Sequence, residues 1–214
     1  MSIPVSGIYV LTDHDGLDDG RLLSDVEAAL QGGVAMIQYR DKSHDHSARH
    51  RRALALRAQC RDYGTPLIIN DDVELCAAVD ADGVHLGRDD GQLESARQQL
   101  GPDKLIGVSC YNELNRARAA AQAGADYLAF GSIFPSDTKP NAVHAPLALL
   151  QLASAQFPAP VCAIGGIGPA NVDRVAAAGA DLVAVIGSVW SGDPRENVAR
   201  LKQAFEQGRQ RQPS

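Results

Sequence analysis

The stretch from Phe130 to Lys139 reads Phe-Gly-Ser-Ile-Phe-Pro-Ser-Asp-Thr-Lys and joins an apolar run to a polar loop. The apolar run, Tyr127 to Gly131, is typical of a buried strand. Beyond it, Ser136, Thr138 and Lys139 carry two hydroxyl groups and an ammonium group, which are hydrogen-bond donors suited to an anion. We therefore predict that this loop binds an anionic group.

Two pairs of carboxylates each follow an apolar run of the sequence. Asp71 and Asp72 follow one run, and Asp89 and Asp90 follow the next. Carboxylates that meet at one edge of a sheet repel each other unless a cation lies between them, and Mg²⁺ takes one or two carboxylates together with phosphate oxygens and water. Helix N-capping is the alternative, and it accounts for Asp72 and also fits Asp89. Asp71 and Asp90 are therefore the expected Mg²⁺ ligands.

A third polar set, Gln38, Arg40 and Lys42, alternates along the chain, so that at a strand end the three side chains share one face. Two positive charges beside an amide suit a polyanion attached to a polar ring. The alternative is a solvated strand end with surface cations. His85 lies inside another apolar run, where it is either a hydrogen-bonded inward-facing histidine or a catalytic group.

Two glycine-containing turns, Gly165 to Gly168 and Gly187-Ser188, follow the last two apolar runs. Glycine lets backbone N–H groups approach an anion closely, and barrel enzymes commonly hold phosphate at this place. Tight packing is the alternative reason for a Gly-Gly pair. Together with the carboxylates, these turns predict two anion sites, as in a reaction that joins two phosphorylated molecules or releases diphosphate near a monophosphate.

Short apolar runs alternate with amphipathic segments along the whole chain. The runs, which we expect to be parallel strands covered on both faces, are Ile8–Thr12, Ala35–Arg40, Leu67–Asn70, Gly83–Leu86, Leu105–Ser109, Tyr127–Gly131, Val161–Gly165 and Leu182–Gly187. The expected helices are Gly20–Gln31, Asp45–Tyr63, Asp72–Val79, Gln92–Leu100, Glu113–Ala123, Pro146–Ala155, Pro169–Ala178 and Pro194–Gln207. A weak repeat, in which Gly-Ala-Asp precedes an apolar run, begins at Gly124 and at Gly179, with a looser copy at Ala81.

This alternation predicts an α/β fold, a single (β/α)8 TIM barrel that forms one domain over residues 1–214. In such a barrel the active-site residues lie at the carboxyl ends of the strands, where all the polar sets above are found. The alternative is an open doubly wound sheet. It is disfavoured because no Gly-x-Gly-x-x-Gly follows the first run.

Composition narrows the class of protein further. The chain has 214 residues, 45% hydrophobic, and a net charge of −6, which argues against non-specific binding to nucleic acid or to anionic membranes. The N-terminus lacks the pattern of a signal peptide, and no run is apolar enough to span a membrane. Four widely spaced cysteines read as buried reduced thiols. We expect a cytoplasmic protein.

The motifs in their order closely resemble the thiamine phosphate synthase family. They are Gln38-Tyr-Arg-Asp-Lys42, Ile69-Asn-Asp-Asp72, His85-Leu-Gly-Arg-Asp-Asp90, Gly107-Val-Ser109, Gly131-Ser-Ile-Phe-Pro-Ser-Asp-Thr-Lys139 and Ile164-Gly-Gly-Ile167. The resemblance implies that 4-amino-2-methyl-5-hydroxymethylpyrimidine diphosphate loses diphosphate in a dissociative step. The nitrogen of 4-methyl-5-(2-phosphooxyethyl)thiazole then captures the pyrimidine methylene to give thiamine phosphate.

The resemblance also implies a role for each matching residue. Asp71 and Asp90 would bind Mg²⁺, and Lys139, Arg40 and Ser109 would be catalytic. The substrate-binding residues would be Gln38, Arg40, Lys42, Asn70, Ser109, Ser136, Thr138, Lys139, Gly166, Ile186 and Gly187. The diphosphate would lie against Arg40, Lys42, Asn70 and Lys139, the pyrimidine against Gln38 and Ser109, and the thiazole phosphate against the others. The family suggests a homodimer that acts on these two small molecules.

Two positions depart from the family pattern. The family often has threonine at Ser136, which keeps the hydroxyl, and serine at Gly187, where Ser188 could supply the lost donor. The alternatives to a synthase are a thiazole tautomerase-like isomerase, which uses a histidine after strand six, and a phosphate-binding barrel without activity. The presence of Asp71, Asp90 and Lys139 argues against both, and His144 lies beyond that loop.

Overall fold

The computed structural model describes residues 6–12, 18–88, 93–135 and 143–211. Eight parallel strands form a closed barrel in sequence order, and β8 pairs with β1. The strands are β1 Gly7–Leu11, β2 Met36–Tyr39, β3 Leu67–Asn70, β4 Gly83–Leu86, β5 Leu105–Tyr111, β6 Tyr127–Phe130, β7 Val161–Ile164 and β8 Leu182–Val185. The predicted (β/α)8 barrel is confirmed, and the open sheet is excluded because the sheet closes on itself.

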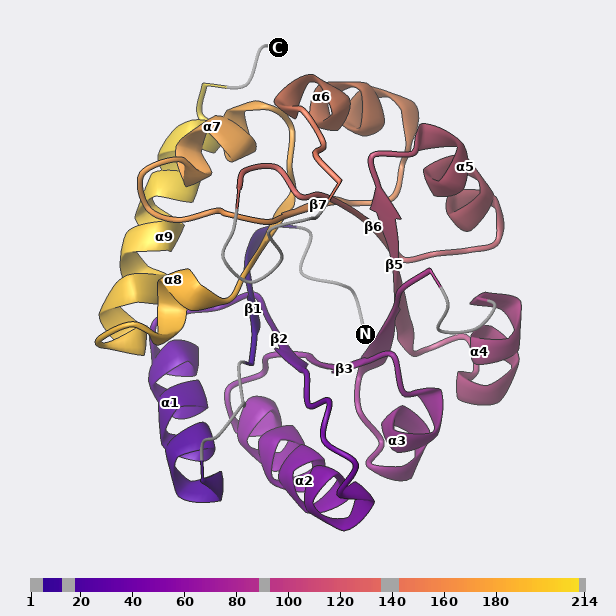
Figure 1. The fold of residues 1–214 in the computed structure, drawn as a ribbon, viewed down its shortest axis with the longest axis vertical. Coiled ribbons are helices and arrows are strands. Elements are labelled where there is room, and N and C mark those ends of the chain that lie inside the picture. Colours follow the sequence, from indigo (N-terminus) through magenta and orange to yellow (C-terminus); the bar gives the residue numbers. More distant parts are fainter. Residues whose placement is uncertain (1–5, 13–17, 89–92, 136–142, 212–214) are drawn as a thin grey trace.

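Helices surround the barrel (Figure 1). They are α1 Asp19–Gln31, α2 His46–Asp62, α3 Val73–Ala78, α4 Leu93–Leu100, α5 Leu114–Gln122, α6 Leu147–Gln156, α7 Val172–Ala177, α8 Gly187–Trp190 and α9 Pro194–Arg209. The last helix, α9, packs against α1 and α7 and so joins the two ends of the ring (Figure 1). Because every strand is parallel, all carboxyl ends lie at one end of the barrel.

Most elements begin or end within one or two residues of the predicted bounds, and three of the differences have a structural reason. The helix expected from Pro169 begins at Val172, because the Asn171 side chain accepts the Gly168 N–H at 2.9 Å and holds a turn in front of it. The eighth strand ends at Val185 rather than Gly187, since the short helix α8, which was not predicted, begins there. Strand β5 continues past the expected end through an irregularity in its pairing with β6.

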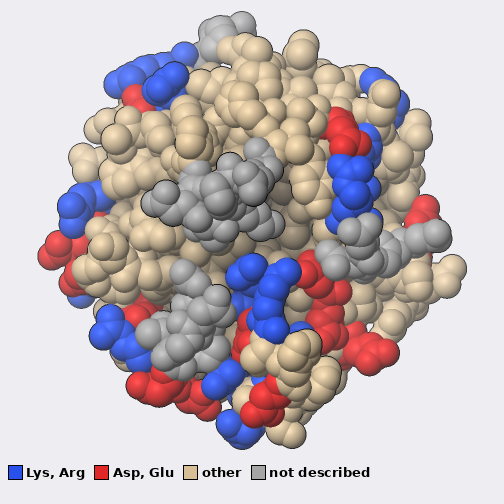
Figure 2. Space-filling view, in the orientation of Figure 1, with Lys and Arg blue, Asp and Glu red and all other residues tan. Residues whose placement is uncertain are grey.

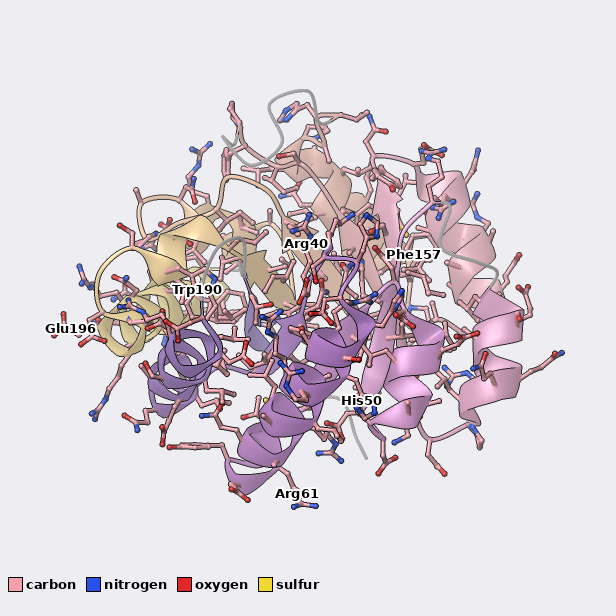
Figure 3. The ribbon with its side chains drawn as sticks, turned by 60° about the horizontal axis from the view of Figure 1, so that its bottom comes forward. Arg40, His50, Arg61, Phe157, Trp190 and Glu196 are labelled. Carbon is pink, nitrogen blue, oxygen red and sulfur yellow. The ribbon has the colours of Figure 1, made fainter. Side chains whose placement is uncertain are left out.

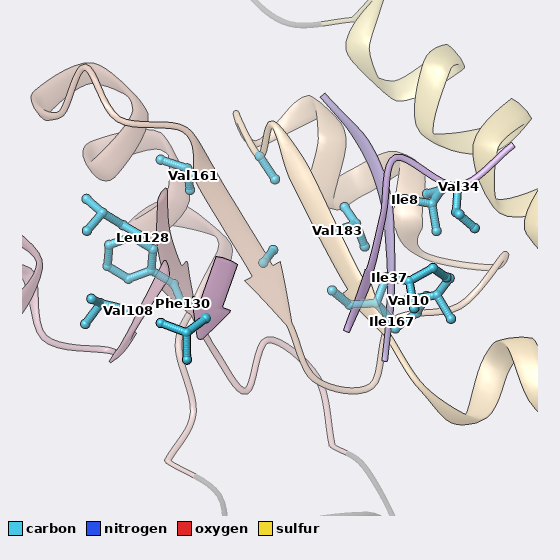
Figure 4. Packing of buried hydrophobic residues seen from close by; sticks show 14 of the residues in the cluster. Ile8, Val10, Val34, Ile37, Val108, Leu128, Phe130, Val161, Ile167 and Val183 are labelled. Carbon is cyan, nitrogen blue, oxygen red and sulfur yellow. The ribbon is translucent and has the colours of Figure 1, made fainter. Parts of the chain in front are cut away.

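The core consists of two apolar layers separated by the strands. Because side chains alternate along a strand, Tyr9 and Leu11 face the barrel interior, whereas Ile8 and Val10 face the helices. Figure 4 shows part of the outer layer, in which side chains of neighbouring strands pack side by side. The four cysteines are buried and unbridged, as predicted, and burial raises the pKa of each thiol to about 12.

The Asp of the internal repeat has a structural role at the amino end of the barrel. Asp82, Asp126 and Asp181 each precede an even-numbered strand, and each side chain accepts the N–H of the first or second residue of the preceding strand. The donors are Leu67, Ile106 and Val161, at 2.8, 2.7 and 2.9 Å. Each carboxylate also pairs with an arginine: Arg57, Arg97 or Arg209. The repeat therefore supplies a side-chain acceptor for a strand N–H at the amino end of β3, β5 and β7.

No helix within the described ranges is both long and apolar enough to cross a membrane.

We expect Asp82→Ala to lower the free energy of unfolding by about 2–4 kcal/mol, because it leaves the buried Leu67 N–H and the Arg57 guanidinium without their partner. Asp80→Asn is the matched control, because asparagine tolerates the left-handed backbone of this position, where φ is +52°. The Asp80 side chain is 81% exposed and pairs with Lys104, so loss of its charge should cost less than about 1 kcal/mol. Urea denaturation measures both values. Equal losses in the two variants would contradict this role of Asp82.

Candidate active site

Charged side chains gather at the carboxyl end of the barrel, over the ends of β2 and β3, where Figure 2 shows basic and acidic groups side by side. Figure 3 shows Arg40 at this end, opposite Arg61, which lies in the last turn of α2. The backbone of Arg40 is tied to β1: its N–H donates to the Thr12 hydroxyl at 2.9 Å, and that hydroxyl donates to the Arg40 carbonyl at 3.3 Å. Thr12 thus fixes the end of β2.

The Asp41 carboxylate, which lies between Arg40 and Lys42 in the sequence, accepts three hydrogen bonds from other residues. Its oxygens accept hydrogen bonds from the Tyr39 hydroxyl at 2.8 Å, the Ser43 N–H at 2.8 Å and Arg52 Nη1 at 3.0 Å. Burial alone would raise the pKa of Asp41, but the hydrogen bonds from Ser43, Tyr39 and Arg52 outweigh it and lower the pKa to about 2. Burial and the adjacent carboxylate raise the pKa of Tyr39.

This arrangement leaves the two cations available. Within the described part of the chain, neither Arg40 nor Lys42 forms an ion pair, because the one carboxylate between them in sequence is held by Arg52. Arg40 is partly buried and Lys42 is exposed. Two positive charges without an ion pair among the described residues, at the carboxyl end of the barrel, could bind an anion with more than one charge.

At the end of β3, Asp71 has an unusual backbone conformation. Its φ is +65°, in the left-handed region, and its N–H donates to the His85 carbonyl at 2.9 Å. The Asn70 side-chain amide donates to Asp71 Oδ2 at 2.6 Å and orients that carboxylate. Non-glycine residues in this region are uncommon and cluster at functional sites, where surrounding contacts hold them.

The other acidic residues predicted at this edge of the barrel are Asp72, Asp89 and Asp90, and the structure describes Asp72. Asp72 caps α3 by accepting the Leu75 N–H at 2.8 Å and pairs with Arg49 at 2.7 Å, so the capping interpretation of Asp72 is confirmed. Asp89 and Asp90 lie outside the described residues. Among the side chains that are described, no three His, Cys, Asp or Glu groups converge as a metal site. Of the two predicted Mg²⁺ ligands, Asp71 lies within the described residues and Asp90 does not.

A chain of hydrogen bonds crosses the barrel interior and links two predicted substrate residues. Gln38 Nε2 donates to the Tyr9 hydroxyl at 2.6 Å, which lies 2.9 Å from the Tyr127 hydroxyl. The Tyr127 hydroxyl is 3.0 Å from His85 Nδ1, and His85 Nε2 is 2.9 Å from Ser109 Oγ. Burial raises the pKa of both tyrosines. His85 is thus an inward-facing, hydrogen-bonded histidine that joins Ser109 to the barrel interior.

The loop after β6 lies against the loop after β7. The N–H groups of Ile133 and Phe134 donate to the carbonyls of Ile164 and Gly165, both at 3.0 Å. A Cβ on Gly166, whose φ is +61°, would lie 2.3 Å from the Pro135 carbonyl oxygen. Close backbone packing therefore explains this glycine pair without any ligand. Ser136, Thr138 and Lys139 lie outside the described residues.

The end of β8 offers space beside a buried hydroxyl. A Cβ on Gly187 would meet no atom within 4 Å, so the serine common at this position in the family would fit. Ser188 Oγ is buried and has no hydrogen-bond partner in the described part of the chain. The Ile186 side chain packs against the apolar barrel interior, and its carbonyl accepts the Val189 N–H at 3.0 Å.

Sequence reasoning missed four residues that organise this rim: Tyr9, Thr12, Asp41 and Tyr127. One signal was present for the tyrosines, because a Tyr within an apolar strand needs a hydrogen-bond partner once it is buried. The contacts of Thr12 and Asp41 depend on residues of other elements, and no sequence pattern indicated them.

Comparison with known proteins assigns the family. A family model described as thiamine monophosphate synthase matches residues 8–189. The chain belongs to this family. It is 52% identical over 200 residues to thiamine-phosphate synthase of Thiobacillus denitrificans, covering 93% of this chain and 94% of the relative. The corresponding protein of Chromobacterium violaceum is 52% identical over 196 residues, covering 92% and 94%.

A solved structure supports the same family. Thiamine phosphate pyrophosphorylase from Pyrococcus furiosus superposes with a TM-score of 0.86 at 34% identity, covering 96% of this chain and 98% of that one. A structure titled native KDPGal, at 17% identity and a TM-score of 0.74, shares the barrel fold alone. The resemblance read from the sequence motifs is thereby confirmed at the level of the family.

Because the pKa of Asp41 is about 2 when folded, against about 3.9 for an unfolded Asp, its hydrogen bonds should contribute about 2 kcal/mol of stability. This contribution is fully present above about pH 4 and is lost as pH falls through about 2. We expect Asp41→Asn to be less stable at pH 7 by this amount, and the difference should vanish in acid. Urea denaturation from pH 7 to pH 2, with the exposed Asp62→Asn as control, measures it. A pH-independent difference would contradict the assignment.

Proposed function

We propose that this chain is a transferase that joins 4-amino-2-methyl-5-hydroxymethylpyrimidine diphosphate to 4-methyl-5-(2-phosphooxyethyl)thiazole, releasing diphosphate and thiamine phosphate. Family membership supports the reaction, and relatives about half identical carry the corresponding name. The observation that carries the proposal is that Arg40 and Lys42, at the carboxyl end of β2, have no ion pair within the described residues. Asp41, the carboxylate between them in sequence, is held by Arg52 instead. A leaving diphosphate needs such unneutralised cations.

The diphosphate would be held by Arg40, Lys42, Asn70 and Lys139. Arg40 offers a planar fork of donors that matches phosphate oxygens, and lysine ammonium groups supply compact charge. Because Thr12 ties the Arg40 backbone to β1, the backbone at this point is already ordered before an anion binds.

Asp71 and Asp90 would hold Mg²⁺. The donor set fits this ion, because Mg²⁺ prefers carboxylate oxygens and completes its shell with phosphate and water. The Asn70 amide, which donates to Asp71 Oδ2, would orient the carboxylate toward the ion. When bound, Mg²⁺ would neutralise charge that develops on the leaving diphosphate.

In the reaction, the bond between the pyrimidine methylene and the diphosphate oxygen breaks, and its electron pair leaves with the diphosphate. The thiazole nitrogen then gives its lone pair to the resulting cation and forms the new C–N bond. Gln38 and Ser109 would orient the pyrimidine, and Lys139 and Arg40 would stabilise the departing charge. Ser136, Thr138, Gly166, Ile186 and Gly187 would hold the thiazole phosphate.

We further propose that residues 1–214 form one domain, that the protein acts in the cytoplasm on these two small molecules, and that it forms a homodimer. Its net charge of −6 supports a protein that binds neither nucleic acid nor anionic membranes. A tautomerase-like isomerase and a binding protein remain the competing functions. The Asp71 carboxylate, which the Asn70 amide orients at the end of β3, supports a metal-dependent transferase over both.

Purified protein supplied with both substrates and Mg²⁺ should form thiamine phosphate, measured as its fluorescent thiochrome derivative. Lys139→Ala should slow turnover roughly 100-fold or more, as when one donor to a developing negative charge is removed. Lys104→Ala is the control, since Lys104 pairs with Asp80 at the amino end of the barrel. Absence of product from the wild type would refute the proposed reaction, and full activity in Lys139→Ala would refute the role of that lysine.

Asp71→Asn should weaken Mg²⁺-dependent binding of the pyrimidine diphosphate by roughly tenfold or more, because the neutral amide is a poorer ligand for a hard cation. Isothermal titration with the diphosphate substrate, with Mg²⁺ and with chelator, measures this without turnover. Asp103→Asn, in an exposed turn before β5, should bind as the wild type does. Binding that is equally strong with chelator would count against a metal at Asp71.

A further inference from the structure

The Arg52 guanidinium, on α2, bridges carboxylates from two other parts of the chain. Its Nε–H donates to Asp19 Oδ1 at 2.6 Å, in the first turn of α1, and its Nη1–H donates to Asp41 Oδ2 at 3.0 Å, just after β2. The Arg52 side chain is 18% exposed and that of Asp41 is 4% exposed. Burial raises the pKa of Asp41, but its hydrogen bonds outweigh this effect and lower the pKa to about 2. Arg52 therefore faces a carboxylate that is both buried and ionised at neutral pH.

The Asp41 carboxylate is held on the helix side of β2. Tyr39, whose hydroxyl donates to it at 2.8 Å, belongs to the outer apolar layer, and Arg52 reaches it from α2. No ion pair joins Asp41 to Arg40 or to Lys42, both of which the structure describes, although the three residues are consecutive in the sequence. The contacts of Tyr39 and Arg52 thus direct the negative charge toward the helices and not toward its two basic neighbours.

We propose that Arg52 is a positioning residue that keeps the charge of Asp41 away from the cations that would bind the leaving diphosphate. A buried carboxylate that loses its only arginine is strongly disfavoured. Arg40 and Lys42, which have no ion pair within the described residues, would then be the nearest cations in sequence to pair with it. A diphosphate would have to compete with that carboxylate. This inference rests on the proposed function, which assigns Arg40 and Lys42 to the diphosphate.

A second buried ion pair on the same helix offers a matched control. Arg57, also on α2, is 17% exposed and lies 3.4 Å from the Asp82 carboxylate, whose side chain is 6% exposed. Asp82 precedes β4 at the amino end of the barrel, whereas Asp41 follows β2 at the carboxyl end. Replacement of Arg57 therefore removes an equally buried arginine from the same helix and leaves the charges after β2 unchanged.

Isothermal titration with inorganic diphosphate and Mg²⁺ tests the proposal without turnover, on variants that circular dichroism shows to be folded. Arg52→Gln should weaken binding about tenfold, because an unpaired negative charge then competes with the ligand. Arg57→Gln should change it less than about twofold. Asp41→Asn should bind as the wild type does, because Asp41 does not contact the ligand. Asp41→Asn added to Arg52→Gln should restore the affinity, since a neutral amide attracts neither cation.

The double variant separates the proposed role from a purely structural one. If Arg52 only stabilised the fold, the double variant would bind as weakly as Arg52→Gln or more weakly, and that result would overturn the proposal. Wild-type affinity in Arg52→Gln would also overturn it, as would equal losses of affinity in Arg52→Gln and Arg57→Gln.

Steady-state kinetics relates the pair to the proposed reaction. In an active enzyme, Arg52→Gln should raise the KM for the pyrimidine diphosphate about tenfold and change the KM for the thiazole phosphate less than about twofold, and Asp41→Asn should reverse the rise. Equal rises in both KM values would overturn the role of Arg52 and leave the reaction in place. An inactive wild type whose diphosphate binding falls in Arg52→Gln and recovers in the double variant would refute the reaction and leave the role of Arg52 supported.

Discussion

Closure of the parallel sheet, in which β8 pairs with β1, is the constraint on which the rest of this structure depends. Closure removes both sheet edges and divides every strand into an inward and an outward face. The outward face meets the helices and is apolar. The inward face must fill a narrow space, and here it does so with two tyrosines, a glutamine and a histidine in addition to aliphatic side chains. The enclosed Gln38, Tyr9 and Tyr127 side chains hydrogen-bond one another, and the partly buried His85 continues this chain of hydrogen bonds to Ser109.

Carboxylates at the two ends of the barrel serve different purposes. At the amino end, Asp82, Asp126 and Asp181 each accept a strand N–H and pair with an arginine, so these carboxylates stabilise the fold. At the carboxyl end, Asp41 is bound in the same way, but Arg40 and Lys42 on either side of it have no ion pair within the described residues. Among the described residues, therefore, the carboxylates at the amino end are paired with arginines, whereas these two cations at the carboxyl end are not.

The carboxyl rim also holds the conformations that a stable fold would avoid. Asp71 occupies the left-handed region, and Ser188 Oγ is buried without a partner in the described part of the chain. Both features cost free energy and both lie where parallel barrels bind ligands. By contrast, the sequence of the Gly165-Gly166 turn suggested a phosphate-binding site. In the structure this turn packs closely on the backbone of the loop after β6. A glycine pair is therefore weaker support for a ligand than the strained aspartate.

The sequence by itself determined the order of the elements, the barrel class and the residues at the strand ends, because these follow from local periodicity and from the rule that parallel strands share a carboxyl end. It also carried the family motifs, which the comparisons confirm. Only the tertiary structure decided which strand-end groups are neutralised and which remain free. Arg52 reaches Asp41 from a helix, and Tyr9 meets Tyr127 across 118 positions of the chain. Such contacts join residues far apart in the sequence that the closed barrel brings together, so no local pattern of residues indicates them.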